Sequence, residues 1–579
     1  MSVHNEEIAH IFEEMADLLE IEEANPFRVR AYRNAAQTVR GLGEELGAMV
    51  TAGEDLTDLP GIGKDLAAKI VEILDTGHAR SLDKLHREVP ASLEDLLRIP
   101  GLGPHRVKAL FHELHISNLK QLEQAAKKGK LRELRGFGAK TEQRILEALQ
   151  AHRDEGRRFM HTVARQYAEP LATYLQSLPG VQHVVVAGSY RRGQETVGDL
   201  DILATADDSA EVIRQFTRYD EVAKIVSEGQ TRSTVYLRCG LQVDLRVVPA
   251  ESFGAALHYF TGNKAHNIQI RRLGQQRGLK INEYGVFDLH EGGERWVAGR
   301  TEDSVFGALE LPFIPPELRQ GQGEVEAAQA RRLPHLIERE DLQGDLHVHT
   351  DASDGSADLE AMALAAKARG LKYIAITDHS RALRVAHGLD AERLARQGEA
   401  IDRLNERLKG ITLLKGCEVD ILEDGSLDLP DKVLARLDLV IGAVHSKFRL
   451  SRRKQTERLL RAMDSRYFTL LAHPTARLLE EREGIEVDMP RIIAAARERG
   501  CFLELNSQPR RLDLTDVYCR HAKELGVMIS IDSDSHSPGG FDLLEGGIAQ
   551  ARRGWLEKRD VLNTRPLAAL RKVLRATMG

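Results

Sequence analysis

The stretch Gly188-Ser189-Tyr190-Arg191-Arg192-Gly193, followed by Gly198-Asp199-Leu200-Asp201-Ile202, decides the fold of the central part of this chain. Side chains on a strand alternate between its faces, so Asp199 and Asp201 project the same way, about 7 Å apart. Asp244 lies in the apolar run Val243-Asp244-Leu245-Arg246, so a neighbouring strand can bring it alongside. Three convergent carboxylates suit a pair of Mg²⁺ ions, which take oxygen ligands and leave room for substrate phosphates.

The glycine-rich segment before the aspartates is suited to those phosphates. Backbone N–H groups at Gly188 and the hydroxyl of Ser189 can approach a triphosphate closely. Arg192, and less directly Arg191, can neutralise it with a fork of donors. An isolated Asp-x-Asp is usually a solvated strand edge. Here the loop, the pair and the third aspartate follow in order within about sixty residues, which predicts nucleotidyl transfer.

Length and composition bound the class of protein. A chain of 579 residues is too long for one core, so three or more domains are expected. The net charge of −7 does not indicate nucleic-acid binding, although Lys and Arg are dense within 127–158 and 449–461. Four scattered cysteines indicate a reducing compartment. The sequence starts without a signal-peptide pattern and has no apolar stretch that could span a membrane, which predicts a cytoplasmic protein.

The first 155 residues are predicted to be helical, because apolar residues recur there at helical spacing. A Gly-hydrophobic-Gly turn occurs three times before an amphipathic stretch. The glycines are Gly61 and Gly63, Gly101 and Gly103, and Gly136 and Gly138. A turn of this kind exposes backbone N–H groups at the positive end of a helix dipole, which suits DNA phosphate. One such turn is an ordinary helix connection. Three of them resemble helix-hairpin-helix motifs, which bind duplex DNA without sequence preference.

Residues from 343 onward alternate short β runs with helices, which predicts a parallel α/β domain of the barrel type. Most of its histidines and carboxylates directly follow an apolar β run, where the strands of a barrel present catalytic side chains. These candidate metal ligands are His347, His349, Asp354, His379, Glu418, His445, His473, Asp534 and His536. One buried histidine is usually a satisfied core residue. Nine candidates at strand ends indicate a metal cluster.

Residues 1–315 resemble a family X DNA polymerase, the group that contains polymerase beta. The motifs that carry the resemblance are Gly-Ser-x-x-Arg-Gly, Gly-Asp-x-Asp, Val-Asp-x-Arg, Tyr259-Phe260-Thr261-Gly262 and Ile281-Asn282-Glu283-Tyr284. The resemblance implies that Asp199, Asp201 and Asp244 are catalytic and hold two Mg²⁺ or Mn²⁺ ions. The nucleotide-binding residues that it implies are Gly188, Ser189, Arg192, Gly198, Tyr259, Phe260, Gly262, Asn267 and Arg271.

Two thumb-side pairs have more specific roles in this resemblance. Tyr259 and Phe260 would lie against the sugar of the incoming deoxynucleoside triphosphate and oppose a 2′-hydroxyl, although an aromatic pair can also be plain core. Asn267 and Arg271 would lie near the nascent base pair and the template. Lys264 stands where the vertebrate member has an acidic residue.

Lys69 matches the lysine that forms a Schiff base with an abasic sugar phosphate in this family. Lysine performs that chemistry only when it is deprotonated. A lysine on a helix that faces DNA is more often a phosphate contact, and the nearby Phe27, Arg28 and Asn34 depart from the family's basic set. The sequence leaves both roles of Lys69 open.

Residues 341–579 resemble the polymerase and histidinol phosphatase (PHP) domain. The resemblance implies a distorted barrel with up to three Mn²⁺ or Zn²⁺ ions, which the mixed ligands do not separate. The implied groups are His347, His349, Glu418 and Asp534 for one ion, Glu418, His445 and His473 for the second, and Asp354, His379 and His536 for the third. A water between the ions would attack phosphorus. Because every matched position is filled, the domain is predicted to be active. The basic residues Arg449, Arg452, Arg453 and Lys454 either lead DNA in or form a solvated helix.

The predicted fold is multidomain: a helical helix-hairpin-helix region, an α/β nucleotidyltransferase palm with a thumb, and a C-terminal distorted (β/α) barrel of the PHP type. The predicted regions are 1–90 (lyase-like helical), 91–155 (fingers-like helical), 156–250 (palm), 251–315 (thumb), 316–340 (a polar linker) and 341–579 (PHP). This organisation predicts a monomeric polymerase that fills short gaps in DNA repair and carries a metal-dependent 3′→5′ exonuclease or abasic-site endonuclease. Its partners would be gapped or primer-template DNA and deoxynucleoside triphosphates, with no membrane. The alternatives are a PHP domain that hydrolyses pyrophosphate or another small phosphate ester, and a DNA-end-binding scaffold without activity.

Overall fold

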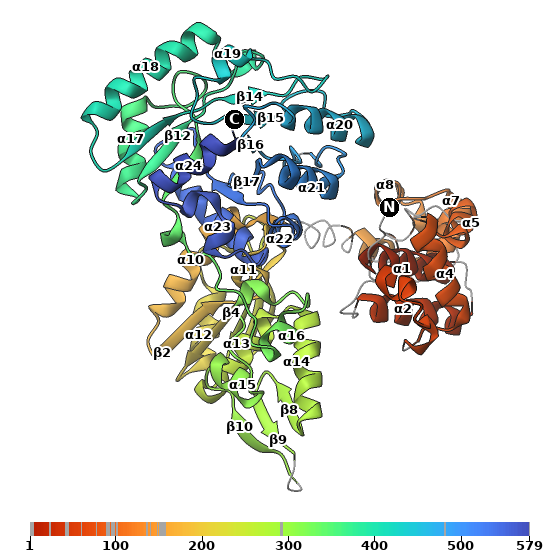
Figure 1. Ribbon diagram of the computed structural model, residues 1–579. Coiled ribbons are helices and arrows are strands. Elements are labelled where there is room, and N and C mark those ends of the chain that lie inside the picture. Colours follow the sequence, from red (N-terminus) through yellow and green to blue (C-terminus); the bar gives the residue numbers. More distant parts are fainter. Residues whose placement is uncertain are drawn as a thin grey trace. The chain divides into compact units, whose positions relative to one another are not determined.

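Figure 1 shows the computed structural model of the chain, which describes residues 5–577 apart from short segments. The segments left out are 22–24, 41–45, 60, 77, 89–92, 94–95, 97–98, 100–101, 103, 135–136, 139–140, 147–148, 150–157, 290–292 and 480–481. The chain forms two compact units, one comprising Met1–Arg158 with Gly321–Gly323 and the other Phe159–Gln320 with Glu324–Gly579. Among the described residues, no helix combines the length and apolar character that crossing a membrane requires.

The N-terminal unit is built from helices, as the periodicity predicts. Its described elements are α1 (Asn5–Ile21), α2 (Pro26–Arg40), α3 (Leu46–Thr51), η1 (Leu56–Asp58), α4 (Lys64–Thr76), α5 (Arg80–Glu88), α7 (Pro104–Leu114), α8 (Leu119–Lys127) and η3 (Leu131–Glu133). The apolar face predicted for α1, with Phe12 and Met15 among its members, is buried in a core shared by both predicted helical regions. Gly61, at φ +79°, and Gly63 precede α4. Gly101, Gly103 and Gly136 fall outside the described residues.

The palm is a mixed sheet in the order β2-β4-β7-β6-β5. Its strands are β2 (Val181–Val186), β4 (Asp199–Ala206), β5 (Val222–Glu228), β6 (Arg232–Leu237) and β7 (Gln242–Val247), beside a short pair β1 (Phe159–Met160) and β3 (Thr196–Val197). Helices α10 (His161–Gln176) and α12 (Ser209–Thr217) share one core with Leu200, Ile202 and Ala204 of β4. Because side chains alternate along a strand, this packing leaves Asp199 and Asp201 on the opposite face of β4.

The thumb consists of η4 (Ala250–Ser252), α13 (Phe253–Thr261), α14 (Lys264–Gln276), the three-stranded sheet β8 (Leu279–Asn282), β9 (Gly285–Asp288) and β10 (Arg295–Ala298), and α15 (Glu302–Ala308). Residues 316–340, predicted as a polar linker, differ from that expectation. They form η5 (Pro316–Leu318) and α16 (Glu324–Gln329), and Leu318, Val325 and Ala328 are buried in the thumb core. Three apolar side chains spaced among charged neighbours are enough to anchor the segment.

The PHP domain contains two parallel sheets, β11-β12-β13 and β14-β15-β16-β17-β18. The strands are β11 (Gly344–Val348), β12 (Tyr373–Ile376), β13 (Thr412–Lys415), β14 (Glu418–Asp420), β15 (Ile441–Ala443), β16 (Leu470–Leu471), β17 (Phe502–Asn506) and β18 (Ile529–Asp532). Isolated bridges Val348–Ser535 and His379–Glu418 link the sheets at two places, which is consistent with the predicted distorted barrel.

Helices surround these strands in Figure 1. They are α17 (Leu359–Ala368), α18 (Ala391–Arg407), α19 (Asp431–Leu434), α20 (Arg452–Met463), α21 (Met489–Arg499), α22 (Asp516–Glu524), α23 (Leu544–Arg553) and α24 (Leu567–Thr577), with short turns η6 (Arg339–Asp341), η7 (Arg384–Ala386), η8 (Gly540–Leu543), η9 (Lys558–Asp560) and η10 (Leu562–Thr564).

The palm and the PHP domain contact each other through a partly buried ion-pair network. Glu195, which directly precedes β3, accepts hydrogen bonds from Arg477 at 2.7 and 3.1 Å and from Gln550 at 2.7 Å. Arg553 donates to the backbone oxygen of Gly193 at 2.9 Å. A second pair, Arg165 with Glu545 at 2.5 Å, is exposed to solvent. The palm loop that leads to the aspartates is therefore fixed against the PHP domain.

Candidate active sites

The three aspartates of the palm meet on adjacent strands. Strands β4 and β7 pair in parallel, with Asp201 opposite Asp244 and Asp199 opposite Gln242. The prediction that a neighbouring strand brings Asp244 alongside is confirmed. Thr234 donates to Asp244 Oδ1 at 2.5 Å and Gln242 donates to Asp244 Oδ2 at 2.7 Å, which fixes the orientation of this carboxylate.

The electrostatics of the aspartates favour bound cations. Burial, together with the neighbouring carboxylates Asp199 and Asp244, raises the pKa of Asp201 to about 7. The three neighbouring carboxylates cannot all be ionised at neutral pH unless a positive charge lies among them. A donor set made only of carboxylate oxygens matches the preference of Mg²⁺ and Mn²⁺, so the residues fit the two predicted ions.

The glycine-rich segment begins helix α11 (Gly188–Arg191) beside the aspartates. Gly188 has φ +60°, and a Cβ there would lie 2.3 Å from Asp201 Oδ2. Only glycine therefore lets the segment approach the carboxylate so closely. Arg192 lies near Asp201 and Asp199, and burial lowers its pKa to about 10, which keeps it cationic at neutral pH.

Arg191 does not serve the phosphate role that the sequence offered for it. It binds Glu302 through two hydrogen bonds of 2.9 and 2.6 Å and donates to Thr261 Oγ1 at 2.7 Å. Its guanidinium is thus occupied in joining the palm to the thumb. Arg192 donates to the backbone oxygen of Thr261, which brings the predicted triphosphate ligand next to the predicted sugar-contacting segment.

The thumb residues predicted to contact the nucleotide lie at the end of α13 and on α14. The rings of Tyr259 and Phe260 meet edge to face at 5.0 Å, and Arg246 lies over the Phe260 ring at 4.5 Å. Gly262, at φ +64°, ends α13. Asn267 donates to Tyr259 O at 2.7 Å, and the side chain of Arg271 reaches back to Asn267 O at 3.4 Å. The structure thus places these residues together, and their contacts with substrate stay predictions.

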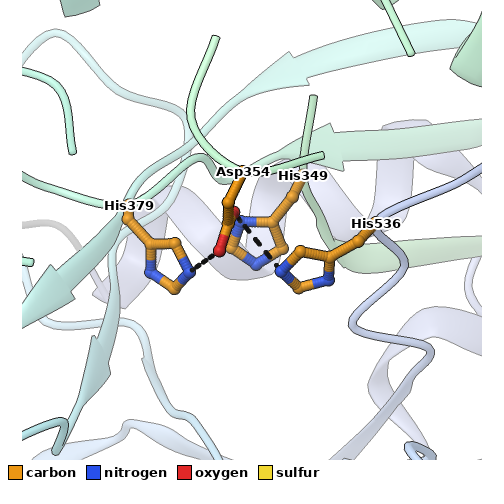
Figure 2. Close-up of side chains that lie close together, drawn as sticks. All are labelled: His349, Asp354, His379 and His536. Atoms are coloured by element: carbon orange, nitrogen blue, oxygen red, sulfur yellow. Dashed lines mark ion pairs between the residues drawn. The ribbon is translucent and has the colours of Figure 1, made fainter. Parts of the chain in front are cut away.

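The nine predicted ligands of the PHP domain converge at the ends of its strands. His347 and His349 are fully buried, and Glu418 lies among the histidines of four other segments. Its carboxylate oxygens are 2.7 Å from His379 Nδ1, 2.9 Å from His473 Nε2 and 3.2 Å from His445 Nε2. Figure 2 shows His349, Asp354, His379 and His536 directed toward one another, with Asp354 3.3 Å from His379 and 3.4 Å from His536.

Three groups of these side chains are close enough to share an ion. They are His349, Asp354, His379 and His536; His347, His349 and Asp534; and His379, Glu418 and His445. The grouping differs from the implied one in four details, the first being that Glu418 is not a member of the group of His347, His349 and Asp534. His349 reaches the Asp354 group as well as Asp534, and His379 joins Glu418 and His445. His473 instead contacts Glu418 directly, so it remains beside that group.

Charge pairing shifts the pKa values of the cluster in opposite directions. Burial alone would lower the pKa of His379 and His445, but Glu418 and the other neighbouring carboxylates outweigh it and raise these values to about 10 and about 9. Burial would raise the pKa of Glu418, yet the surrounding histidines hold it well below its usual value. Carboxylates that attract positive charge this strongly mark a place for cations.

The hydrogen bonding of the PHP cluster also fits metal ions. Within the described part of the chain, the buried ring nitrogens His347 Nε2 and His349 Nε2 make no hydrogen bond. Buried polar atoms are normally hydrogen-bonded, so atoms that converge without one are suited to coordinate. Mixed imidazole and carboxylate donors fit Mn²⁺ or Zn²⁺.

Glu504 contacts the PHP cluster but was not among the residues predicted from the sequence. Its Oε1 lies 2.5 Å from His347 Nδ1, and its Oε2 accepts the backbone N–H of His473 at 2.6 Å. A carboxylate behind a ligand histidine fixes the ring and its tautomer. Asn506, two residues later on β17, donates to both Glu504 and Asp534. The sequence feature that could have indicated Glu504 is its position as a charged residue inside the apolar run Phe502–Leu505.

Lys69 lies on α4, and its amine is 2.6 Å from Asp65 Oδ1. Its side chain is 14% exposed. The structure therefore provides Lys69 with a carboxylate partner one turn away, and neither predicted role is decided. The described hairpin glycines Gly63 and Gly138 have nothing within 4 Å of a Cβ position, which leaves their backbone open for a phosphate.

Comparison with protein families finds five matching regions. Residues 3–79 match a helix-hairpin-helix domain, 93–151 a SAM-like helix-hairpin-helix tandem, 153–249 the DNA polymerase beta palm, 256–320 the DNA polymerase beta thumb and 345–508 the PHP domain. The DNA polymerase/3'-5' exonuclease PolX of Bacillus subtilis (strain 168) is 38% identical over 567 residues, which cover 98% of each chain. The chain belongs to the family X DNA polymerases. The predicted multidomain fold of this family X polymerase is thereby confirmed.

Two further relatives each cover a part of this family X polymerase. DNA polymerase lambda of Rattus norvegicus is 28% identical over 298 residues, 47% of this chain and 49% of its own. A probable phosphatase of Thermoanaerobacter sp. (strain X514) is 29% identical over 231 residues, 38% of this chain and 89% of its own. This family X polymerase therefore carries similarity to two kinds of enzyme that also occur separately.

Proposed function

We propose that this chain is a DNA-templated DNA polymerase that fills short gaps during DNA repair and removes nucleotides from a 3′ end at its PHP domain. The observation that carries the proposal is the presence of two clusters of candidate ligands on one chain, three aspartates in the palm and eight histidines and carboxylates, with His473 beside them, in the PHP domain. Divalent cations bound there would lower the pKa of the attacking hydroxyl or water and neutralise charge on the leaving group. We propose Mg²⁺ or Mn²⁺ for the palm and Mn²⁺ or Zn²⁺ for the PHP domain.

At the palm, the chain's own residues orient the substrates. Gly188 and Ser189 present backbone and hydroxyl donors to the triphosphate, and Arg192 supplies positive charge beside Asp201. Tyr259 and Phe260 oppose a 2′-hydroxyl, which selects deoxynucleotides. The hairpin turns of the N-terminal unit bind DNA phosphates without reading sequence. The protein would act in the cytoplasm as a monomer, on gapped or primer-template DNA.

At the PHP domain, Glu418 would bind between the histidines of neighbouring groups, and Glu504 would keep His347 directed at the same centre. Linkage to DNA-binding motifs raises the effective concentration of DNA ends at this second site, which favours a nuclease. Cleavage at abasic sites is a further reaction of the same chemistry.

Separate inactivation of the two sites tests the proposal. Asp201→Ala is expected to abolish nucleotide addition to a gapped primer and to leave Mn²⁺-dependent shortening of that primer within twofold of wild type. His349→Ala is expected to do the reverse. Loss of both activities in either variant would contradict two independent sites.

A second candidate function is favoured by the similarity to a probable phosphatase, 89% of which is covered. In that case the PHP domain would hydrolyse pyrophosphate or another small phosphate ester. The wild-type protein separates the two candidates. If it leaves a labelled 3′ end intact with Mn²⁺ but releases phosphate from a small ester, the second candidate holds.

A further inference from the structure

The mouth of the PHP metal cluster is partly apolar. A cavity of about 260 Å³ opens above the predicted ligands. Besides the ligands it is lined by Leu383, Val385, Ala386 and Arg511. A small phosphate ester offers charge and hydrogen bonds but little apolar surface, so three apolar side chains at the rim need another explanation.

The three apolar residues lie on one loop, residues 380–389, whose base is fixed. Ser380 pairs with Leu389, Ser380 N donates to Glu418 O at 3.0 Å, and Leu389 N donates to the oxygen of the ligand His379 at 2.7 Å. Asp428 anchors the next turn of the loop by accepting the N–H of Ala382 at 2.8 Å. The loop is therefore attached directly to two metal-ligand segments, and its tip is held over the cluster.

The tip presents Val385 to solvent. Its exposed fraction is 87%, the highest among the large hydrophobic residues that the structure describes as exposed. A single exposed apolar residue is ordinary on a protein surface. Here, however, the residue lies at the rim of a catalytic cavity and beside the half-buried Leu383. An apolar ligand surface that covers it would gain about 25 cal/mol for each Å² removed from water.

The cavity supplies a cation to complement this apolar rim. Arg511 is 20% exposed, and its Nε lies 3.8 Å from Asp534 Oδ2. It can therefore contact a phosphate held over the cluster. In a nucleotide, one sugar joins the base to the phosphate. With the phosphate held over the cluster, the flat face of the base would therefore cover the apolar rim.

We propose that the 380–389 loop is a nucleobase-contacting rim, with Val385 against the base of the 3′-terminal nucleotide, and that it makes the PHP centre select the end of a polynucleotide. This inference rests on the exonuclease function proposed above and assigns Val385 as a specificity-determining residue.

The test compares two single-stranded oligonucleotides that differ only at the 3′-terminal residue, which is either thymidine or a tetrahydrofuran analogue without a base. Val385→Ser is expected to lower kcat/KM with Mn²⁺ about fivefold for the thymidine end and to leave the value for the base-free end unchanged. The loss should be in KM, with kcat and metal content as in wild type. The matched control is Leu364→Ser on α17, an exposed leucine (50%) that does not line the cavity and should change neither value.

An equal fall of kcat/KM on both oligonucleotides, or no fall on either, would contradict the proposed contact between Val385 and the base. A different result would overturn the exonuclease itself: wild type would leave both oligonucleotides intact while it releases phosphate from glycerol 2-phosphate. The two failures are thus separate outcomes of one assay.

Discussion

The two candidate metal centres of this chain are built in opposite ways. The palm centre uses three carboxylates on neighbouring strands of one sheet, and Asp201 faces Asp244 directly across the pairing. The PHP centre collects imidazoles and carboxylates from the ends of many strands, with His347 and His349 fully buried. Both arrangements suit divalent cations, but their internal electrostatics differ.

The difference teaches how each centre depends on its ions. Burial, together with repulsion from Asp199 and Asp244, raises the pKa of Asp201 to about 7. In the PHP centre, neighbouring histidines instead hold the pKa of Glu418 well below its usual value. The palm carboxylates therefore need counter-charge from outside, whereas the carboxylates of the PHP cluster already have histidines beside them. We expect the palm to acquire ions together with the nucleotide and the PHP domain to retain them without substrate.

The largest expected effect follows from changing the carboxylate at the middle of the PHP centre. Glu418 approaches five histidines, more than any other ligand of the cluster contacts. Glu418→Gln should lower 3′-end degradation more than about 10³-fold, because the cation-binding cluster loses the negative charge that lies beside five of its histidines. Primer extension by the same preparation should stay within twofold of wild type. A comparable fall in extension would mean that the centres are not independent.

A smaller effect is expected from the carboxylate behind the ligands. Glu504→Gln keeps the size of the side chain but weakens its hold on His347, which should lower metal affinity and degradation about 10- to 100-fold. Metal content after dialysis, measured by mass spectrometry, should fall with activity, and excess Mn²⁺ should restore part of it. Glu498→Gln, the same change at an exposed position of α21, is the control. Full metal content with low activity would contradict a positioning role.

The contact between the centres gives a third prediction. Glu195→Ala leaves Arg477 without its palm carboxylate and should lower the free energy of unfolding by about 3 kcal/mol, because a partly buried pair is broken. Glu545→Ala removes the exposed partner of Arg165 and should cost less than about 1 kcal/mol. Denaturant titration distinguishes the two variants, and equal losses would contradict the importance of burial.

The same contact should depend on pH. Burial would raise the pKa of Glu195, but Arg477, Gln550 and Arg553 outweigh it and lower the pKa below its usual value of 4.5. A carboxylate with a lowered folded-state pKa stabilises fully above the unfolded value and loses this contribution as the pH falls through the folded value. Stability measured between pH 7 and pH 3 should therefore fall more steeply in wild type than in Glu195→Gln. Parallel curves would refute this assignment.

The smallest effect concerns the support of the palm carboxylates. Gln242→Ala removes the hydrogen bond to Asp244 Oδ2, while Thr234 still donates to Asp244 Oδ1. Nucleotide addition should fall about three- to tenfold, and degradation should not change. A loss as large as that of Asp201→Ala would show that the palm centre relies on its support as strongly as the PHP centre does.

Much of the fold and of both candidate sites could be predicted from the sequence, because the motifs that indicate them are local. The alternation of Asp199 and Asp201 and the glycine-rich segment predict one face of one strand, and the structure places Asp244 beside them. The linker prediction for 316–340 was different, because burial of Leu318 and Val325 depends on a thumb core assembled from distant residues. Likewise, the sequence did not reveal that Arg191 forms an ion pair with Glu302 or that Glu504 contacts the ring of His347. Both contacts join segments more than 100 residues apart.

Metal content of purified protein tests the central claim most directly. Wild type, Asp201→Ala and His349→Ala would be dialysed against buffer without metal, and bound Mn²⁺ and Zn²⁺ counted for each chain. If the two centres are built differently, wild type and Asp201→Ala should retain equal numbers of bound ions, and His349→Ala should retain clearly fewer. A full complement in His349→Ala, or an equal loss in Asp201→Ala, would contradict the account.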